Sequence, residues 1–338
     1  MMTSRELVAA TLEFRNNTGR VPRKIDYLPW AVDNHPGELE RIMKEFPDDF
    51  GGAYTEYAQR SISKGHPYEI GEYMDDWGCV FSNIHRGVIG EVKNPLVSPD
   101  DDGWDDTSKV HIPEEWLSFN TDMVNKSCAE SDKFIWAGAC PRPFEQLQFI
   151  RGTEQLYMDL ADPPKKMMEF IEKLHDFYCR LLEKWASTDV DGLLMMDDWG
   201  SQNTLLIHPE TWKAIFKPLY RDYINIAHKH GKKMFMHSDG NILLIYPELI
   251  DLGLDALNSQ IFCMGIDNLA RYKGEITFWG EIDRQNLLPH GTVDDIRRAV
   301  EQVKSTLWSN GGCIAQCEFG PSARPENVYE VFASWNRS

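Results

Sequence analysis

Short apolar runs alternate along the chain with longer segments of helical periodicity. The apolar runs predict eight strands, at 24–28, 78–82, 134–137, 192–196, 233–236, 256–258, 277–279 and 313–316. Helical patterns lie between most of them, at 38–45, 164–186, 209–230, 242–252, 267–272 and 293–307, and a last one at 325–335 closes the chain. Such alternation is typical of a parallel sheet with helical crossovers. Eight strands favour an α/β fold of the (β/α)8 TIM-barrel type over an open doubly wound sheet.

The segment from 61 to 115 does not follow this alternation. It contains Asp75-Asp-Trp-Gly78 and the acidic loop Asp100-Asp-Asp-Gly-Trp-Asp-Asp106. We interpret it as an irregular insertion near the mouth of the barrel. Because no repeat, low-complexity tract or long linker marks a boundary, residues 1–338 are predicted to form a single domain.

The net charge disfavours some kinds of binding partner, and the cysteine content indicates the cell compartment in which the protein is expected. The chain has 35 Lys and Arg against 53 Asp and Glu, a net charge of -18, which disfavours nucleic acid and anionic membranes as partners. No apolar run is long enough to span a bilayer, and the first residues lead into an amphipathic helix, unlike a signal peptide. The 7 cysteines form no CxxC pair, which suits a reducing compartment. A cytoplasmic protein is therefore expected.

Polar residues follow four of the predicted strands, at 195–200, 237–239, 279–283 and 316–318. In a (β/α)8 barrel the active site forms at these carboxyl ends. His237 and Asp239 are two residues apart on a strand, so they face the same side. With Cys317 they would make an open zinc site. Asp239 also suits the N-cap of the next helix, and Glu281 suits a fourth ligand, a general base or a solvated rim position.

The neighbours Asp197 and Asp198 face opposite sides of their strand, so at most one of them enters the mouth. The other is expected to cap the following segment or to pair with a lysine. Aromatic residues near the same strand ends, Trp199, Phe262 and Trp279, suit a clamp for an aromatic substrate, although such residues are more often part of the core.

Eight short segments of the chain, in five groups, carry a family resemblance. They are Asp75-Asp-Trp-Gly78 with Gly90-Glu-Val-Lys-Asn-Pro95, Asp197-Asp-Trp-Gly200 with His208-Pro-Glu-Thr-Trp-Lys, Lys232-Lys-Met-Phe-Met-His-Ser-Asp-Gly-Asn-Ile242, Phe278-Trp-Gly-Glu-Ile-Asp-Arg-Gln285, and Gly311-Gly-Cys-Ile-Ala-Gln-Cys-Glu-Phe-Gly320 with Pro325-Glu-Asn-Val328. Together they resemble the uroporphyrinogen decarboxylase superfamily, and within it the cobalamin-dependent methyltransferase branch.

The decarboxylases and the methyltransferases of this superfamily have different residues at the ends of their strands. True decarboxylases have an Arg-Gln-Ala-Gly-Arg type segment after the first strand, whose arginines bind substrate carboxylates, and a histidine on the last strand. Here the first position is Tyr27-Leu-Pro-Trp-Ala-Val-Asp-Asn-His35 and the last is Cys317. The methyltransferase branch has a His-x-Cys pair after the fifth strand and a cysteine on the eighth. His237 and Cys317 match that pattern, and Asp239 replaces the middle cysteine.

The resemblance therefore implies a zinc-dependent methyltransferase that moves a methyl group from an O-methyl substrate to the cobalt of a partner corrinoid (cobalamin) protein. Zinc would be held by His237 and Cys317, with Asp239 or Glu281 as a further ligand, and Asp198 or Glu281 would act as the acid. Two alternatives stay open: a metal-free decarboxylase, and a degenerate barrel that only binds a ligand or a corrinoid partner.

Overall fold

The computed structural model describes residues 2–100 and 102–337, and in them eight parallel strands form a (β/α)8 barrel. Six of the strands pair in the order β10-β9-β8-β7-β6-β2, and β1 pairs with β11. The strands are β1 (Arg23–Tyr27), β2 (Phe50–Gly52), β6 (Phe134–Trp136), β7 (Gly192–Met196), β8 (Lys233–Ser238), β9 (Ala256–Ser259), β10 (Thr277–Gly280) and β11 (Ala315–Phe319).

Two seams close the barrel. Parallel bridges join Phe278 to Cys313 and Glu281 to Gln316, and so connect β10 with β11. Between β1 and β2, the backbone amide of Asp49 donates to the carbonyl of Arg23 at 3.0 Å. The Asp49 carboxylate accepts from the Arg23 amide at 2.9 Å. Carboxylate oxygens thus take the place of ladder carbonyls where the strands diverge.

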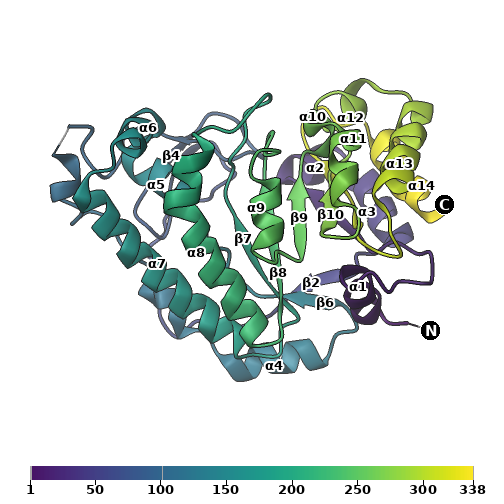
Figure 1. Cartoon of the computed structure of the whole chain (residues 1–338), viewed down its shortest axis with the longest axis horizontal. Coiled ribbons are helices and arrows are strands. Elements are labelled where there is room, and N and C mark those ends of the chain that lie inside the picture. The colour runs from purple at the N-terminus through teal and green to yellow at the C-terminus, as the bar shows by residue number, and fades with distance from the viewer. Residues whose placement is uncertain (1, 101, 338) are drawn as a thin grey trace.

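Helices cover the outside of the barrel, and the long α7 and α8 run side by side along one flank (Figure 1). None of the helices described is both long enough and apolar enough to cross a membrane. The α-helices are α1 (Ser4–Leu12), α2 (Pro29–Asn34), α3 (Pro36–Glu45), α4 (Thr121–Ala129), α5 (Pro143–Arg151), α6 (Thr153–Ala161), α7 (Lys165–Ala186), α8 (Pro209–Lys229), α9 (Tyr246–Asp251), α10 (Ile261–Met264), α11 (Ile266–Leu269), α12 (Leu287–His290), α13 (Val293–Leu307) and α14 (Pro325–Arg337), with 3-10 turns at Gly103–Asp105, Glu114–Ser118 and Ala270–Tyr272.

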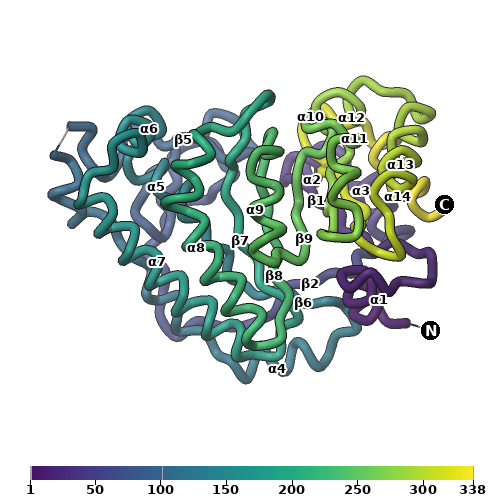
Figure 2. The backbone as a smooth tube through the Cα atoms, in the orientation of Figure 1, coloured from purple at the N-terminus to yellow at the C-terminus, as the bar shows by residue number. Residues whose placement is uncertain are grey.

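The interior of the barrel is filled by aromatic side chains from alternate strand positions. Trp136 and Trp279 stack with ring centroids 5.0 Å apart, and Phe235 packs edge-on against Trp136. Val8 and Leu12 of α1 belong to the same buried cluster. Helix α1 therefore closes the amino-terminal end of the barrel, and both termini lie on that flank of the molecule (Figure 2). This leaves the carboxyl ends of the strands to form a site.

One predicted barrel strand is wrong. Val80–Asn83 (β4) does not join the barrel: it pairs antiparallel with Gly71–Met74 (β3) and Glu91–Val92 (β5) inside the predicted insertion. The second barrel strand is β2, which the sequence analysis missed. Its three residues, Phe-Gly-Gly, offer a single large apolar side chain, so no apolar run marks it.

The loops after β7 and β8 are held together by two glycines. The amide of Gly200 donates to the carbonyl of Asp239 at 3.0 Å, and the amide of Asn241 donates to Ser201 at 2.7 Å. Gly240 has φ of 78°, and a Cβ there would overlap the carbonyl of Gly200. Only glycine fits this close approach without strain. The Asp-Gly sequence after β8 therefore fixes where the two strand ends lie relative to each other.

The substitution Gly240→Ala should lower the free energy of unfolding by about 1–3 kcal/mol, because it forces a left-handed backbone on alanine and a clash with Gly200. Chemical unfolding monitored by circular dichroism measures this loss. Gly37→Ala in α3 is the matched control, since a Cβ there meets no atom within 4 Å. It should be neutral or stabilising. Equal midpoints for the two variants would contradict the role of this contact.

Candidate functional site

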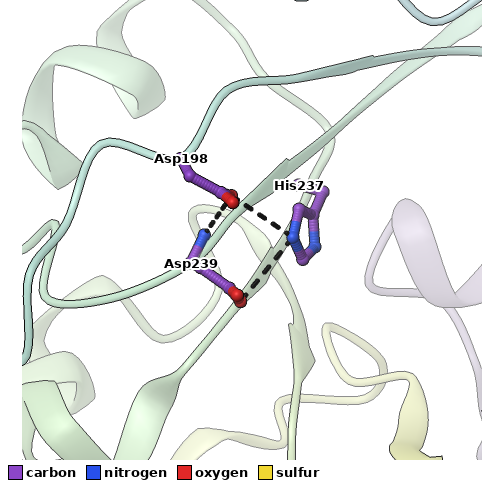
Figure 3. Close-up of side chains that lie close together, drawn as sticks. All are labelled: Asp198, His237 and Asp239. Atoms are coloured by element: carbon purple, nitrogen blue, oxygen red, sulfur yellow. Dashed lines mark hydrogen bonds and ion pairs between the residues drawn. The ribbon is translucent and has the colours of Figure 1, made fainter. Parts of the chain in front are cut away.

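Three polar side chains converge at the ends of β7 and β8. Leu194 and Phe235 face the barrel interior, so alternation places Asp198 and His237 on the same side, above them. The Nε2 atom of His237 lies 3.5 Å from Oδ1 of Asp198 and 3.6 Å from Oδ1 of Asp239 (Figure 3). One ligand atom from each residue lies within 4.8 Å of the others. This is a donor set of one imidazole nitrogen and two carboxylate oxygens.

A hydrogen-bond relay fixes the orientation of the imidazole. Asn258 donates from Nδ2 to the carbonyl of Trp279 at 2.7 Å, which leaves its Oδ1 to accept from Nδ1 of His237. A protonated Nδ1 turns the lone pair of a neutral imidazole to Nε2, toward the two carboxylates. The amide of Asp239 donates to Asp198 Oδ1 at 2.9 Å and ties the two acids together.

Arg284 holds the far side of the cluster. Its Nη2 pairs with Oδ2 of Asp239, and its Nη1 lies 3.4 Å from Glu281 and 3.3 Å from Glu318. The other oxygen of Asp239, Oδ1, is buried and has no hydrogen-bond partner among the described residues. A buried carboxylate oxygen without a donor is costly, and it points at His237.

The electrostatics of the cluster favour one additional positive charge. Burial alone would lower the pKa of His237, but the carboxylates of Asp198 and Asp239 outweigh it and raise this pKa to about 10. Burial would raise the pKa of Asp198, but the imidazole lowers it. A proton on Nε2 satisfies this demand, and so does a divalent metal ion. The nitrogen and oxygen donors and the unpartnered Asp239 oxygen fit such an ion.

The structure does not bring Cys317 to this cluster. Alternation along β11 puts Cys317 on the same face as Ala315 and Phe319, in the core between strands and helices, while Ile314 belongs to the interior cluster. Burial raises the pKa of Cys317 well above that of a free thiol, as does the nearby Glu281. The inward-facing residue at this strand end is instead Glu318. Sequence reasoning chose the cysteine by residue type and did not test its strand parity.

Glu281, the other suggested ligand, lies beside the cluster and not in it. Its side chain is buried and in ion-pair range of Arg284. Burial raises the pKa of Glu281 to about 8, which Arg284 only partly offsets. With Phe262 and Arg284 it lines a small pocket of about 20 Å³.

The suggested aromatic clamp needs correction. Trp199 is fully buried, stacks on Phe144 at 4.0 Å, and donates from Nε1 to the hydroxyl of Tyr220. Trp279 is 5% exposed and packs inside the barrel. Neither ring has a face open to a ligand. Phe262 is the one of the three that lines a pocket.

A much larger pocket, of about 820 Å³, opens beside Asp198. Its walls come from the ends of β6 and β7, from α5 and from the insertion, and partly exposed aromatic side chains line it: Tyr57, Tyr73, Trp116 and Phe149. Arg142 and Glu145 also line it, and the sequence analysis missed both. The signal was present, because Cys140-Pro-Arg-Pro-Phe-Glu145 follows the strand at 134–136 as the other polar segments follow theirs.

Asp197 positions this segment. Its carboxylate accepts from the amides of Phe144 at 3.1 Å and Glu145 at 2.8 Å, and from the hydroxyl of Tyr220 at 2.6 Å. It therefore holds the amino terminus of α5, while Asp198 enters the mouth, as strand alternation predicts. Burial, with a contribution from Asp198, raises the pKa of Glu145 to about 7. Its Oε2 is buried and has no hydrogen-bond partner among the described residues.

Comparisons with known proteins identify a family and a solved structure that are similar to this chain. The family model described as uroporphyrinogen decarboxylase (URO-D) matches residues 77–337. A methyltransferase from Methanosarcina mazei shares the fold with a TM-score of 0.67 at 13% identity, over 100% of this chain and 99% of that chain.

A B12-independent methionine synthase from Shewanella sp. W3-18-1, in complex with selenomethionine, reaches a TM-score of only 0.44 at 9% identity, over 64% of each chain. A similarity this low carries no argument. No curated protein matches the sequence. The family match covers most of the chain. It includes Asp198, His237 and Asp239, and also Arg284, which pairs with Asp239. The chain therefore belongs to the uroporphyrinogen decarboxylase family.

Proposed function

We propose that the protein is a methyltransferase that moves a methyl group from an O-methyl substrate to the cobalt of a separate corrinoid protein. A zinc ion would be held by Asp198, His237 and Asp239. One observation carries this proposal: Nε2 of His237 and two carboxylate oxygens converge beside a pocket of about 820 Å³. The shared fold with the Methanosarcina mazei methyltransferase supports it.

The ligand set differs from the one that the sequence suggested. Asp198 takes the place of Cys317, so the site has no sulfur donor, and oxygen donors make the ion a harder Lewis acid. Three protein ligands leave a position open for substrate. A zinc ion bound there would polarise the ether oxygen and stabilise negative charge on it as the methyl group departs.

The residues around this position bind and orient the substrate. Asp198 belongs both to the cluster and to the pocket wall, so a ligand in the pocket lies next to the metal position. The aromatic side chains of the pocket wall would exclude water and hold the ligand by its ring. Asn258 keeps the imidazole aimed, and Arg284 anchors Asp239.

A proton donor is needed for the departing oxygen. Glu145 lines the 820 Å³ pocket, and its pKa of about 7 leaves it protonated in a large fraction of molecules at neutral pH. Glu281 faces the pocket of about 20 Å³, which is too small for a substrate. We therefore assign the proton donor to Glu145 and leave Glu281, with Arg284, as support for the cluster.

Zinc content provides the first test. Wild-type protein should hold about one zinc ion per chain, and His237→Ala and Asp198→Ala should each lose it, because each removes a donor. Asn258→Ala should weaken zinc binding by about 10–100-fold through loss of the imidazole orientation. Metal analysis by mass spectrometry measures the content. His228→Ala, which removes an exposed imidazole paired with Asp255, is the control and should keep the metal. Zinc that survives His237→Ala would contradict the site.

Methyl transfer provides the second test. A panel of neutral aromatic methyl ethers is incubated with zinc-loaded protein and reduced cob(I)alamin, and formation of the methylated corrinoid is followed by absorbance. Asp239→Ala should lower the rate by at least about 100-fold, because several kcal/mol of charge stabilisation depend on the metal. A rate of methyl transfer that stays unchanged after zinc is removed with a chelator would contradict the proposed mechanism. Decarboxylation of a porphyrinogen without metal would instead support the alternative chemistry of the family.

A further inference from the structure

Arg142 is a charged residue of the pocket wall whose guanidinium forms no ion pair, although it attracts the carboxylate of Glu145 from beyond ion-pair range. It lines the 820 Å³ pocket, yet its guanidinium makes no hydrogen bond or ion pair with any residue that the structure describes. Other arginines of low exposure behave differently. Arg151 pairs with Asp159 at 2.7 Å, and Arg284 is surrounded by three carboxylates. A guanidinium that is partly withdrawn from water normally has an anionic partner.

The carboxylates that share this pocket are mostly engaged by other donors. Oδ1 of Asp75 accepts from the amides of Trp77 at 3.0 Å and Cys79 at 2.7 Å. Asp76 accepts from the Trp116 indole at 3.1 Å. Glu115 pairs with His111 at 2.9 Å. None of them forms an ion pair with Arg142. Glu145 also lines the pocket and attracts Arg142, but no hydrogen bond or ion pair joins the two side chains. The guanidinium of Arg142 can therefore donate hydrogen bonds to a ligand.

The remainder of the wall suits a flat ring. Tyr57, Tyr73, Trp116 and Phe149 line the pocket with partly exposed side chains. Tyr73 belongs to the insertion, Tyr57 and Trp116 flank it on either side in the sequence, and Phe149 belongs to α5. Aromatic walls favour an aromatic ligand through stacked and edge-on contacts. A volume of about 820 Å³ is ample for one substituted ring with two polar groups.

We propose that this pocket binds an aromatic carboxylate, and that Arg142 donates paired hydrogen bonds to the carboxylate of the ligand. The planar guanidinium matches a carboxylate in this way, whereas an ammonium ligand would be repelled by the charge of Arg142. The substrate class is then a methoxylated aromatic acid, with its carboxylate at Arg142 and its methoxy group toward Asp198. The reaction named here rests on the proposed function, but binding of the acid does not.

Calorimetric titration of the full chain tests the proposal with three probes: 4-methoxybenzoate, neutral 4-methoxybenzyl alcohol and cationic phenyltrimethylammonium. The acid should bind about 10–100-fold more tightly than the alcohol, which is the effect of one charge-assisted pair. Arg142→Gln should abolish that preference and leave the affinity for the alcohol unchanged, which also shows that the variant is folded. Arg142→Lys should restore part of it.

Arg86→Gln is the matched control. Arg86, an arginine of the insertion, pairs with Asp33 at 3.0 Å and lines a different pocket, so the acid preference should persist. Equal affinity for acid and alcohol, an acid preference that survives Arg142→Gln, or tightest binding of the cation would each overturn the proposal. Binding of 4-methoxybenzoate through Arg142 without any methyl transfer would overturn the proposed function but not this inference. Methyl transfer from neutral ethers together with equal affinity for the acid and the alcohol would overturn this inference alone.

Discussion

The meeting of two carboxylates at one imidazole nitrogen is the constraint on which the site depends. Asp198 and Asp239 would repel each other if nothing positive lay between them, and one oxygen of Asp239 is buried without a donor. In the protein alone, a proton on His237 meets this demand, which is why its pKa is raised to about 10. The divalent ion of the proposed function would also meet it, because it would coordinate both oxygens and the nitrogen at once.

The surrounding structure maintains this costly arrangement. The glycine contact between the loops after β7 and β8 sets the distance between the two acids. Asn258, on β9, orients the imidazole, and Arg284, beyond β10, neutralises the acids that would otherwise crowd the cluster. Four neighbouring strands therefore contribute to one site at their carboxyl ends. The insertion, its flanking residues and α5 add the aromatic wall of the large pocket, so in the proposed function the substrate contacts and the metal ligands would come from different parts of the chain.

Periodicity predicted the parts of the fold that are long and strongly patterned. Strand 192–196 and helix 293–307 were predicted at their observed bounds, and the barrel with its insertion was predicted correctly. The Phe-Gly-Gly strand escaped because it has almost no side chains to show a pattern. In the site, His237 and Asp239 were predicted to face together because their spacing fixes their side, and the structure shows them together. Cys317 was chosen by chemical type, and its strand position turns it toward the helices. Arg142 follows the strand at 134–136, a signal that the sequence analysis missed, but the pocket that it lines depends on how the insertion folds over the mouth.

X-ray absorption spectroscopy of the zinc-loaded protein tests the central claim most directly. With Asp198, His237 and Asp239 as ligands, the metal should show only nitrogen and oxygen neighbours, at about 2.0–2.2 Å. A sulfur neighbour at about 2.3 Å would mean that a cysteine such as Cys317 turns into the site, and would contradict the ligand set proposed here.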